Sequence, residues 1–248
     1  MDFDEVLARI EAIRHSPEQR VVQAIEWAQW SVEVFRGNCA ELRRILTPLE
    51  EELRTIKYFD IHHRSERDVI YREIGRLVHN FLASAMALVN HTRRHMKQLY
   101  EGCTFLREYH EQIRQRFSRR DSWHPVVQAL RNYTQHRTLP GIGSILSYKV
   151  EEGTRRYFYV PVRSLLTWDG WDTAARKRLE PFTESHLPIR QLVDEYETEV
   201  ASFYEWLWNR QSEIHREDLR RLNRMKDQTS RDLDTAGYGD MVNPPSYV

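Results

Sequence analysis

Arg131, Asn132 and His136 lie within one short segment, Arg-Asn-Tyr-Thr-Gln-His, and their side chains are suited to chemistry on a phosphate. An arginine holds a phosphate through a planar fork of donors, a histidine moves a proton near neutral pH, and an asparagine orients either group. RNA cleavage without a metal needs these abilities, because the 2′-hydroxyl loses a proton, the leaving oxygen gains one, and the phosphorane carries added charge. The segment predicts that Arg131 holds the phosphate, His136 transfers protons and Asn132 fixes the ring or the sugar.

The spacing of arginine and histidine carries little information without the asparagine. With 11 histidines and an arginine-rich composition, about 1.4 pairs at this spacing are expected by chance. The chain contains three: Arg119 with His124, Arg131 with His136, and Arg210 with His215. Requiring an asparagine directly after the arginine lowers the chance expectation to about 0.04. Only Arg131 meets that requirement, so Asn132 carries most of the signal.

The geometry of a helix places Arg131 and His136 awkwardly for a shared target. Residues five apart lie about 140° around an ideal helix, so one helix does not easily aim both side chains at one point. Two copies of the segment meeting at a seam would remove the difficulty, and the chain is therefore expected to form a homodimer. The alternative is that the three side chains cap their own helix, with His136 near the C-terminal carbonyls.

Two prolines delimit the helix that carries this segment, and further helices are predicted before it. Pro125 suits a first helical position and Pro140 a stop, with Val126, Val127 and Leu130 as the buried residues. Helical spacing of apolar residues predicts the preceding helices. They cover residues 3–13, 17–36 with a stop at Gly37, 42–56, 65–101 with a stop at Gly102, and a helix capped by Thr104 that ends near Phe117.

The sequence changes character after Pro140. Residues 144–150 and 154–162 are rich in β-branched and aromatic residues and predict a hairpin, whose second strand Pro161 places at an edge. Asp172 is expected to cap a short helix through Leu179, and a long helix is expected from Pro188 to about Lys226. The predicted fold is all-α: an up-and-down bundle carrying the motif (1–140), the hairpin and long C-terminal helices packed on the same domain (141–227), and an extended or disordered tail (228–248).

The segment Arg131-Asn132-x-x-x-His136, late in a run of amphipathic helices, resembles the signature of HEPN (higher eukaryotes and prokaryotes nucleotide-binding) domains. The resemblance implies a helical bundle that pairs with a second copy, a site at the seam, and metal-independent endoribonuclease activity on RNA. It also implies a toxin or antiviral defence setting with an antitoxin or other partner protein. Thr138 stands where one toxin subgroup has a modified tyrosine, so regulation by that route is not expected.

A line of polar residues on the long helix offers additional groups for the site. Asn80, Ser84 and His91 keep helical spacing beside the apolar stripe, where a polar line is costly unless it is hydrogen-bonded or wet. They are predicted to face the motif, and the alternative is a polar seam or an exposed flank. His91 and His95 have a zinc-ligand spacing, but no glutamate follows His91 and no third ligand is apparent, so no metal site is predicted.

The predicted hairpin interleaves cations with aromatic residues. Lys149, Arg155, Arg156 and Tyr157 suit single-stranded RNA through phosphate pairing and base stacking. An edge hairpin with tyrosines on both faces equally suits a protein interface.

Composition bounds the compartment and the kind of partner. The net charge is zero, with 37 basic and 37 acidic residues, which argues against a uniformly basic coat but leaves room for a local basic site. No window approaches the roughly 18 apolar residues of a membrane span. The acidic N-terminus and the two cysteines, Cys39 and Cys103, favour a reducing cytoplasm. Glycine-rich phosphate loops and serine elbows are lacking, so no cofactor is predicted.

Two rival functions remain open beside the ribonuclease. The first is a non-catalytic HEPN-like scaffold that binds a nucleotide, RNA or protein, with Arg131 and His136 bonded to their own bundle. The second is a plain helical interaction protein with no electropositive cleft near His136.

Overall fold

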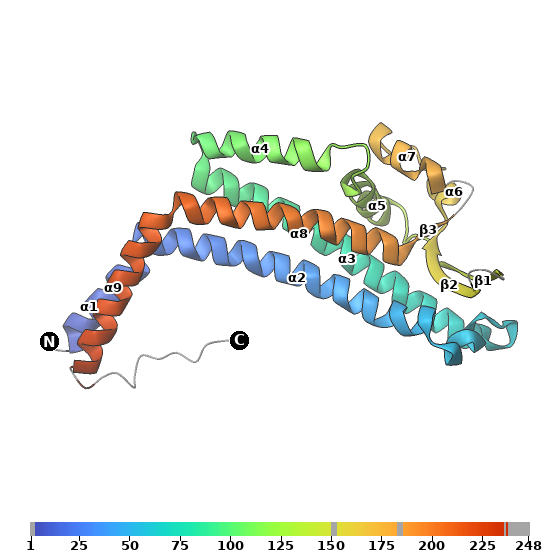
Figure 1. Ribbon diagram of the computed structural model, residues 1–248, viewed down its shortest axis with the longest axis horizontal. Helices are drawn as coiled ribbons and strands as arrows, with labels where there is room; N and C mark the ends of the chain where they lie inside the picture. Colours follow the sequence, from blue (N-terminus) through green and yellow to red (C-terminus); the bar gives the residue numbers. More distant parts are fainter. Residues whose placement is uncertain (1–2, 150–152, 183–185, 236, 238–248) are drawn as a thin grey trace. The chain divides into compact units, whose positions relative to one another are not determined.

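The computed structural model describes residues 3–149, 153–182, 186–235 and 237 (Figure 1). The chain is mostly helical with one small antiparallel sheet, which confirms the helical class and the hairpin. The main helices are α1 (Phe3–Arg14), α2 (Pro17–Glu51), α3 (Arg64–Tyr100), α4 (Thr104–Phe117), α5 (His124–His136), α7 (Thr173–Leu179), α8 (Ile189–Ile214) and α9 (Arg216–Thr235). Short helices η1 (Leu53–Phe59), η2 (Ile61–His63), α6 (Val162–Leu165) and η3 (Glu180–Phe182) connect them. None of the described helices is long and apolar enough to span a membrane.

Helix α2 runs without a break where two helices were predicted. Gly37 lies inside the helix, and its φ is not positive. The helix continues through it because the apolar residues Phe35, Cys39 and Leu42 on either side form one buried stripe. A mid-helix glycine costs about 1 kcal/mol relative to alanine, which the burial of one such side chain offsets. Gly102, by contrast, has a φ of 80° and follows the end of α3, as predicted.

Predicted caps had mixed outcomes. The Asp172 side chain accepts a hydrogen bond from the backbone N of Ala175 at 2.7 Å and begins α7, as predicted. Thr104 was predicted as a cap, but it is the first residue of α4, and Cys103 holds the cap position with no side-chain hydrogen bond.

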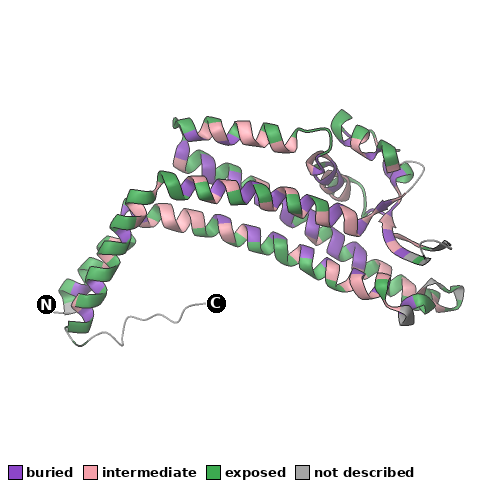
Figure 2. Cartoon of the chain, viewed as in Figure 1, coloured by how far each residue is buried: buried purple, intermediate pink, exposed green. Residues whose placement is uncertain are grey.

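The core of residues 30–205 lies between α2, α3 and α8, which run side by side (Figure 1). Phe35, Phe81 and Tyr196, one from each helix, are fully buried and meet edge to face or tilted, with ring centroids 5.9–6.1 Å apart. Buried residues line the facing sides of these helices (Figure 2). Aromatic contacts of this kind add to the free energy of burying the rings, so this cluster fixes the scaffold on which α5 packs.

The sheet has the order β1-β2-β3, with β1 at Gly143–Lys149, β2 at Gly153–Val160 and β3 at Leu187–Pro188. The prediction that Pro161 places the second strand at an edge was wrong. Pro161 follows β2, and β2 is central because Val160 pairs with Leu187. A two-residue strand has no alternation to detect, so β3 gave no signal in the sequence.

The C-terminal helix is interrupted and longer than predicted. Helix α8 ends at Ile214, α9 follows, and residues 228–235 are helical rather than part of the predicted tail. Leu222, Thr229 and Leu233 form the buried stripe of α9, and a threonine in that stripe hid the pattern. In the unit formed by Met1–Gln29 with Trp206–Val248, α1 and α9 pair through the Arg9–Asp232 ion pair, and Arg221 bonds Glu18 at 3.0 Å.

Candidate functional site

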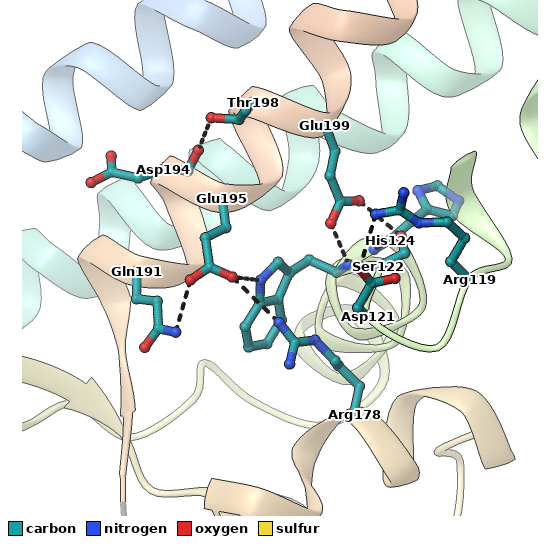
Figure 3. A network of polar contacts seen from close by, with 11 residues as sticks. Arg119, Asp121, Ser122, His124, Arg178, Gln191, Asp194, Glu195, Thr198 and Glu199 are labelled. Atoms are coloured by element: carbon teal, nitrogen blue, oxygen red, sulfur yellow. Dashed lines mark hydrogen bonds and ion pairs between the residues drawn. The ribbon is translucent and has the colours of Figure 1, made fainter. Parts of the chain in front are cut away.

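The N-terminus of α5 is held by a carboxylate of α8 and by Ser122, whose hydroxyl oxygen accepts from the backbone N of His124 at 3.1 Å. The backbone N of Trp123 donates to Glu199 Oε1 at 2.9 Å, and the Ser122 hydroxyl donates to Glu199 Oε2 at 2.8 Å (Figure 3). A negative charge is favourable there because the helix dipole is positive at its start. Burial raises the pKa of Glu199, although both hydrogen bonds act in the opposite direction. Pro125 occupies the first turn, as predicted.

Trp123 ties the same helix end to α8 and α7. Its indole is fully buried, and Nε1 donates to Glu195 Oε2 at 2.5 Å. The Arg178 guanidinium lies 3.7 Å from the centroid of that ring and also bonds Glu195 at 3.3 Å. The N-terminal end of the motif helix is therefore fixed by packing and by charge together.

His124 belongs to the scaffold and not to a catalytic pair with Arg119. Its Nδ1 lies 3.1 Å from the Tyr196 hydroxyl, and it lines a cavity of about 40 Å³ together with Tyr109 and Phe117. Burial lowers its pKa to about 4, and the charge of Arg93 acts in the same direction. His124 is therefore neutral at physiological pH.

This lowered pKa predicts a loss of stability in mild acid. Below the ordinary value of 6.5 the unfolded chain takes up a proton that the folded protein does not bind until about pH 4, so stability falls as pH falls through that window. Between pH 7 and pH 5 the free energy of unfolding is expected to drop by up to about 2 kcal/mol on account of His124. Urea melts of wild type and His124→Gln at both pH values measure this. The raised pKa of Glu199 acts in the opposite sense in both proteins, so the difference isolates His124; equal pH dependence of the two would contradict the assignment.

Arg131 and Asn132 line a polar pocket between α3 and α5, which we call the α3–α5 pocket. Its polar lining residues are Asn90, Arg93, Gln128, Arg131 and Asn132, and its volume is about 110 Å³. Arg131 and Asn132 are half-buried, and Arg131 Nη1 donates to Asn132 Oδ1 at a long 3.4 Å. Two guanidinium groups and three carboxamides, with no carboxylate in the lining, suit an anion with several acceptor oxygens.

His136 lies apart from this pocket. It is the last residue of α5, its side chain is exposed, and it is not among the lining residues. The helix end is closed instead by the backbone N of Arg137, which donates to Tyr133 O at 2.9 Å. Within the described part of the chain, His136 makes no hydrogen bond to the C-terminal carbonyls. One chain therefore brings together Arg131 and Asn132 but leaves the side chain of His136 exposed.

The additional groups predicted on α3 do not line the α3–α5 pocket. Ser84 is buried and donates to Phe81 O at 3.0 Å, His91 Nδ1 lies 2.8 Å from the Ser31 hydroxyl, and Asn80 is half-buried. The pocket instead uses the neighbouring stripe of the same helix, which supplies Met86, Val89, Asn90 and Arg93. These four keep the i, i+3, i+4, i+7 spacing of one helix face. Asn80, Ser84 and His91 keep helical spacing on the adjacent face, so the sequence alone does not choose between the two.

Arg156 of the hairpin is structural, which corrects its prediction as an RNA contact. It is only 8% exposed, and its Nη1 donates to Glu52 O at 2.5 Å and to the Thr55 hydroxyl at 2.9 Å. Strand alternation places Arg156 on the same inward face as Phe158, where its guanidinium reaches the Glu52 carbonyl just after α2. Tyr157 is half-buried against Tyr159, with ring centroids 6.4 Å apart. The side chains of Lys149 and Arg155 lie outside the described residues.

Within the described ranges, no group of three or more histidine, cysteine, aspartate or glutamate side chains is placed to hold a metal ion. The two histidines with a zinc-ligand spacing, His91 and His95, differ in burial, since His91 is exposed and His95 is buried.

In comparisons with known proteins, no family model, no curated protein and no solved structure matches this chain. The likeness to HEPN domains thus depends on Arg131, Asn132 and His136 themselves.

Proposed function

We propose that this protein binds single-stranded RNA with a backbone phosphate in the α3–α5 pocket and cleaves it without a metal. The observation that carries the proposal is the pocket itself, where Arg93 and Arg131 meet three carboxamides on the motif helix and its neighbour. A phosphate accepts several hydrogen bonds and carries negative charge, which this lining matches. In this proposal Arg131 is the main phosphate ligand and Asn132 orients the bound nucleotide.

The proposed reaction uses the RNA's own 2′-oxygen as the nucleophile. A base removes the 2′-hydroxyl proton, the oxygen forms a bond to the adjacent phosphorus, and the bond to the 5′-oxygen breaks as an acid gives that oxygen a proton. The products are a 2′,3′-cyclic phosphate and a 5′-hydroxyl, so atoms and charge balance. His136 is proposed as the proton-transfer group. Because it is exposed and apart from the pocket, a homodimer that brings His136 of a second protomer to Arg131 would complete the site.

The biological setting belongs to the same proposal and depends on the resemblance to HEPN ribonucleases. A toxin or antiviral effector of this kind acts in the cytoplasm, and an antitoxin or defence-system partner would control it. RNA is the proposed substrate, and the proposed reaction uses no cofactor.

A second candidate is a non-catalytic RNA- or nucleotide-binding subunit. The separation of His136 from the α3–α5 pocket favours it, because a binding site needs Arg131 and Asn132 but no proton-transfer group. It predicts RNA binding without strand cleavage.

A cleavage assay on His136→Ala separates the two candidates. We expect wild type to cut labelled single-stranded RNA in excess chelator, and His136→Ala to cut it about 10²–10⁴-fold more slowly with binding unchanged. His62→Ala, which removes another exposed histidine, is the matched control and should retain full activity. Equal cleavage by wild type and His136→Ala would reject His136 as the catalytic group. Binding by both with no cleavage by either would support the non-catalytic candidate.

A further inference from the structure

A second and larger hollow lies on α3, toward its N-terminal end, against the segment that follows α5. It has a volume of about 550 Å³ and is lined by Tyr71, Arg72, Arg76 and His79 of α3 and by Leu139 and Ile142. We call it the α3 groove. Its size falls in the range of sites that hold small organic molecules. Leu139 follows His136 by three residues, so the groove begins close to the proposed proton-transfer group in the chain.

Two arginines and a histidine lie on the α3 side of the groove. Arg72, Arg76 and His79 recur at i, i+4 and i+7, so they share one face of α3, and all three are exposed. Arg76 is paired with Glu73 at 2.6 Å, whereas Arg72 has no ion pair among the described residues. An anion lying along this face could therefore pair with the Arg72 guanidinium and share Arg76 with Glu73.

The segment after α5 gives the α3 groove its apolar lining, and Tyr71 of α3 adds to that lining. Leu139 is 48% exposed, and Ile142 lies beside Gly75, where an added Cβ would be 4.0 Å from its Cγ1. Tyr71 is held by a 2.7 Å hydrogen bond between its hydroxyl and Ser144 and by an edge contact with Phe158. Apolar side chains and arginines that line the same hollow fit a ligand with a flat apolar part and an attached anion.

We propose that the α3 groove binds a nucleotide of single-stranded RNA next to the phosphate that is cleaved. The base would lie against Leu139 and Ile142, and flanking phosphates would contact Arg72 and Arg76. This inference rests on the proposed function and adds a second site, which holds the base and phosphates beside the cleaved phosphate. A base must be unstacked to enter a groove, which favours a single strand over a duplex. An acidic peptide would satisfy the arginines but leave the apolar lining uncovered.

The test measures RNA binding in the His136→Ala background, so that the RNA stays intact. Arg72→Gln is compared with Arg94→Gln, another exposed arginine of α3 that lines neither the pocket nor the groove. Leu139→Ser is compared with Leu7→Ser, since Leu7 is similarly exposed at 43%. We expect both groove variants to bind a labelled single strand roughly tenfold more weakly, and both controls to bind like the parent. Arg72→Gln should also reduce the slope of log affinity against log salt by about 0.7.

The outcomes distinguish this inference from the proposed function. If the groove variants bind RNA as tightly as the control variants, the α3 groove is not an RNA site. The proposal for the α3–α5 pocket would then still stand. Failure of the parent to bind RNA would overturn both. Equal affinity for a duplex would overturn the single-strand assignment, and displacement of RNA by a glutamate-rich peptide at equal concentration would assign the groove to an acidic protein partner instead.

Discussion

Replacing Trp123 by alanine is expected to lower the free energy of unfolding by about 3–5 kcal/mol. The indole is fully buried, and its loss would leave a cavity under the start of α5. It would also leave Glu195 without the indole N–H and Arg178 without the ring below it. Urea denaturation followed by circular dichroism measures the change.

Exposed tryptophans provide the control for this prediction. Trp30 is 66% exposed, and Trp30→Ala should change the free energy of unfolding by less than about 1 kcal/mol. Trp123→Phe keeps a buried ring but lacks the N–H donor, so its loss should be intermediate between wild type and Trp123→Ala. A loss below 1 kcal/mol for Trp123→Ala would show that the start of α5 does not depend on this contact.

Arg131→Ala is expected to slow RNA cleavage by about 10²–10³-fold, because it removes the main donor to the phosphate as charge develops there. Arg131→Lys should recover only part of that loss, since an ammonium lacks the planar fork. The fold should be unaffected, because the side chain is half-buried and its one described side-chain hydrogen bond is long. Single-turnover cleavage and RNA binding, measured in chelator, give the two effects separately.

Arg120→Ala is the matched control for Arg131, since Arg120 is exposed and lines neither hollow. It should cleave RNA at the wild-type rate. Unchanged cleavage by Arg131→Ala would remove Arg131 from the proposed site, whereas weaker binding at an unchanged single-turnover rate would limit it to ground-state binding.

Local patterns predicted the elements that have strong local causes. Pro125 marked the start of α5, Gly102 the end of α3, and Asp172 the start of α7, because each acts on its own few residues. Predictions failed where tertiary packing decided the outcome. The buried stripe of α2 outweighs Gly37, and β3 exists because β2 offers it a partner.

The candidate site also combines features that local sequence predicts with features that tertiary packing decides. Arg131 and Asn132 do share a pocket, but their neighbours on α3 could not be chosen from the sequence, since two adjacent stripes of that helix both carry polar residues. Arg156 lies in a segment whose cations and aromatic residues are typical of a nucleic-acid contact, yet its guanidinium donates to the Glu52 carbonyl just after α2. Only the packed structure reveals which donor is already used.

The unequal ends of α5 bear on the entropy of association. Its start is fastened by Glu195 and Glu199, while its last turn exposes Gln135 and His136. The backbone beneath His136 is already helical in a single chain, and Arg137 N closes its last turn by donating to Tyr133 O. When a second protomer or an RNA strand binds this end, the main entropic cost is that of fixing side chains, about 0.5–1.5 kcal/mol each. No segment has to fold on binding. That small cost leaves more of the contact energy available as affinity.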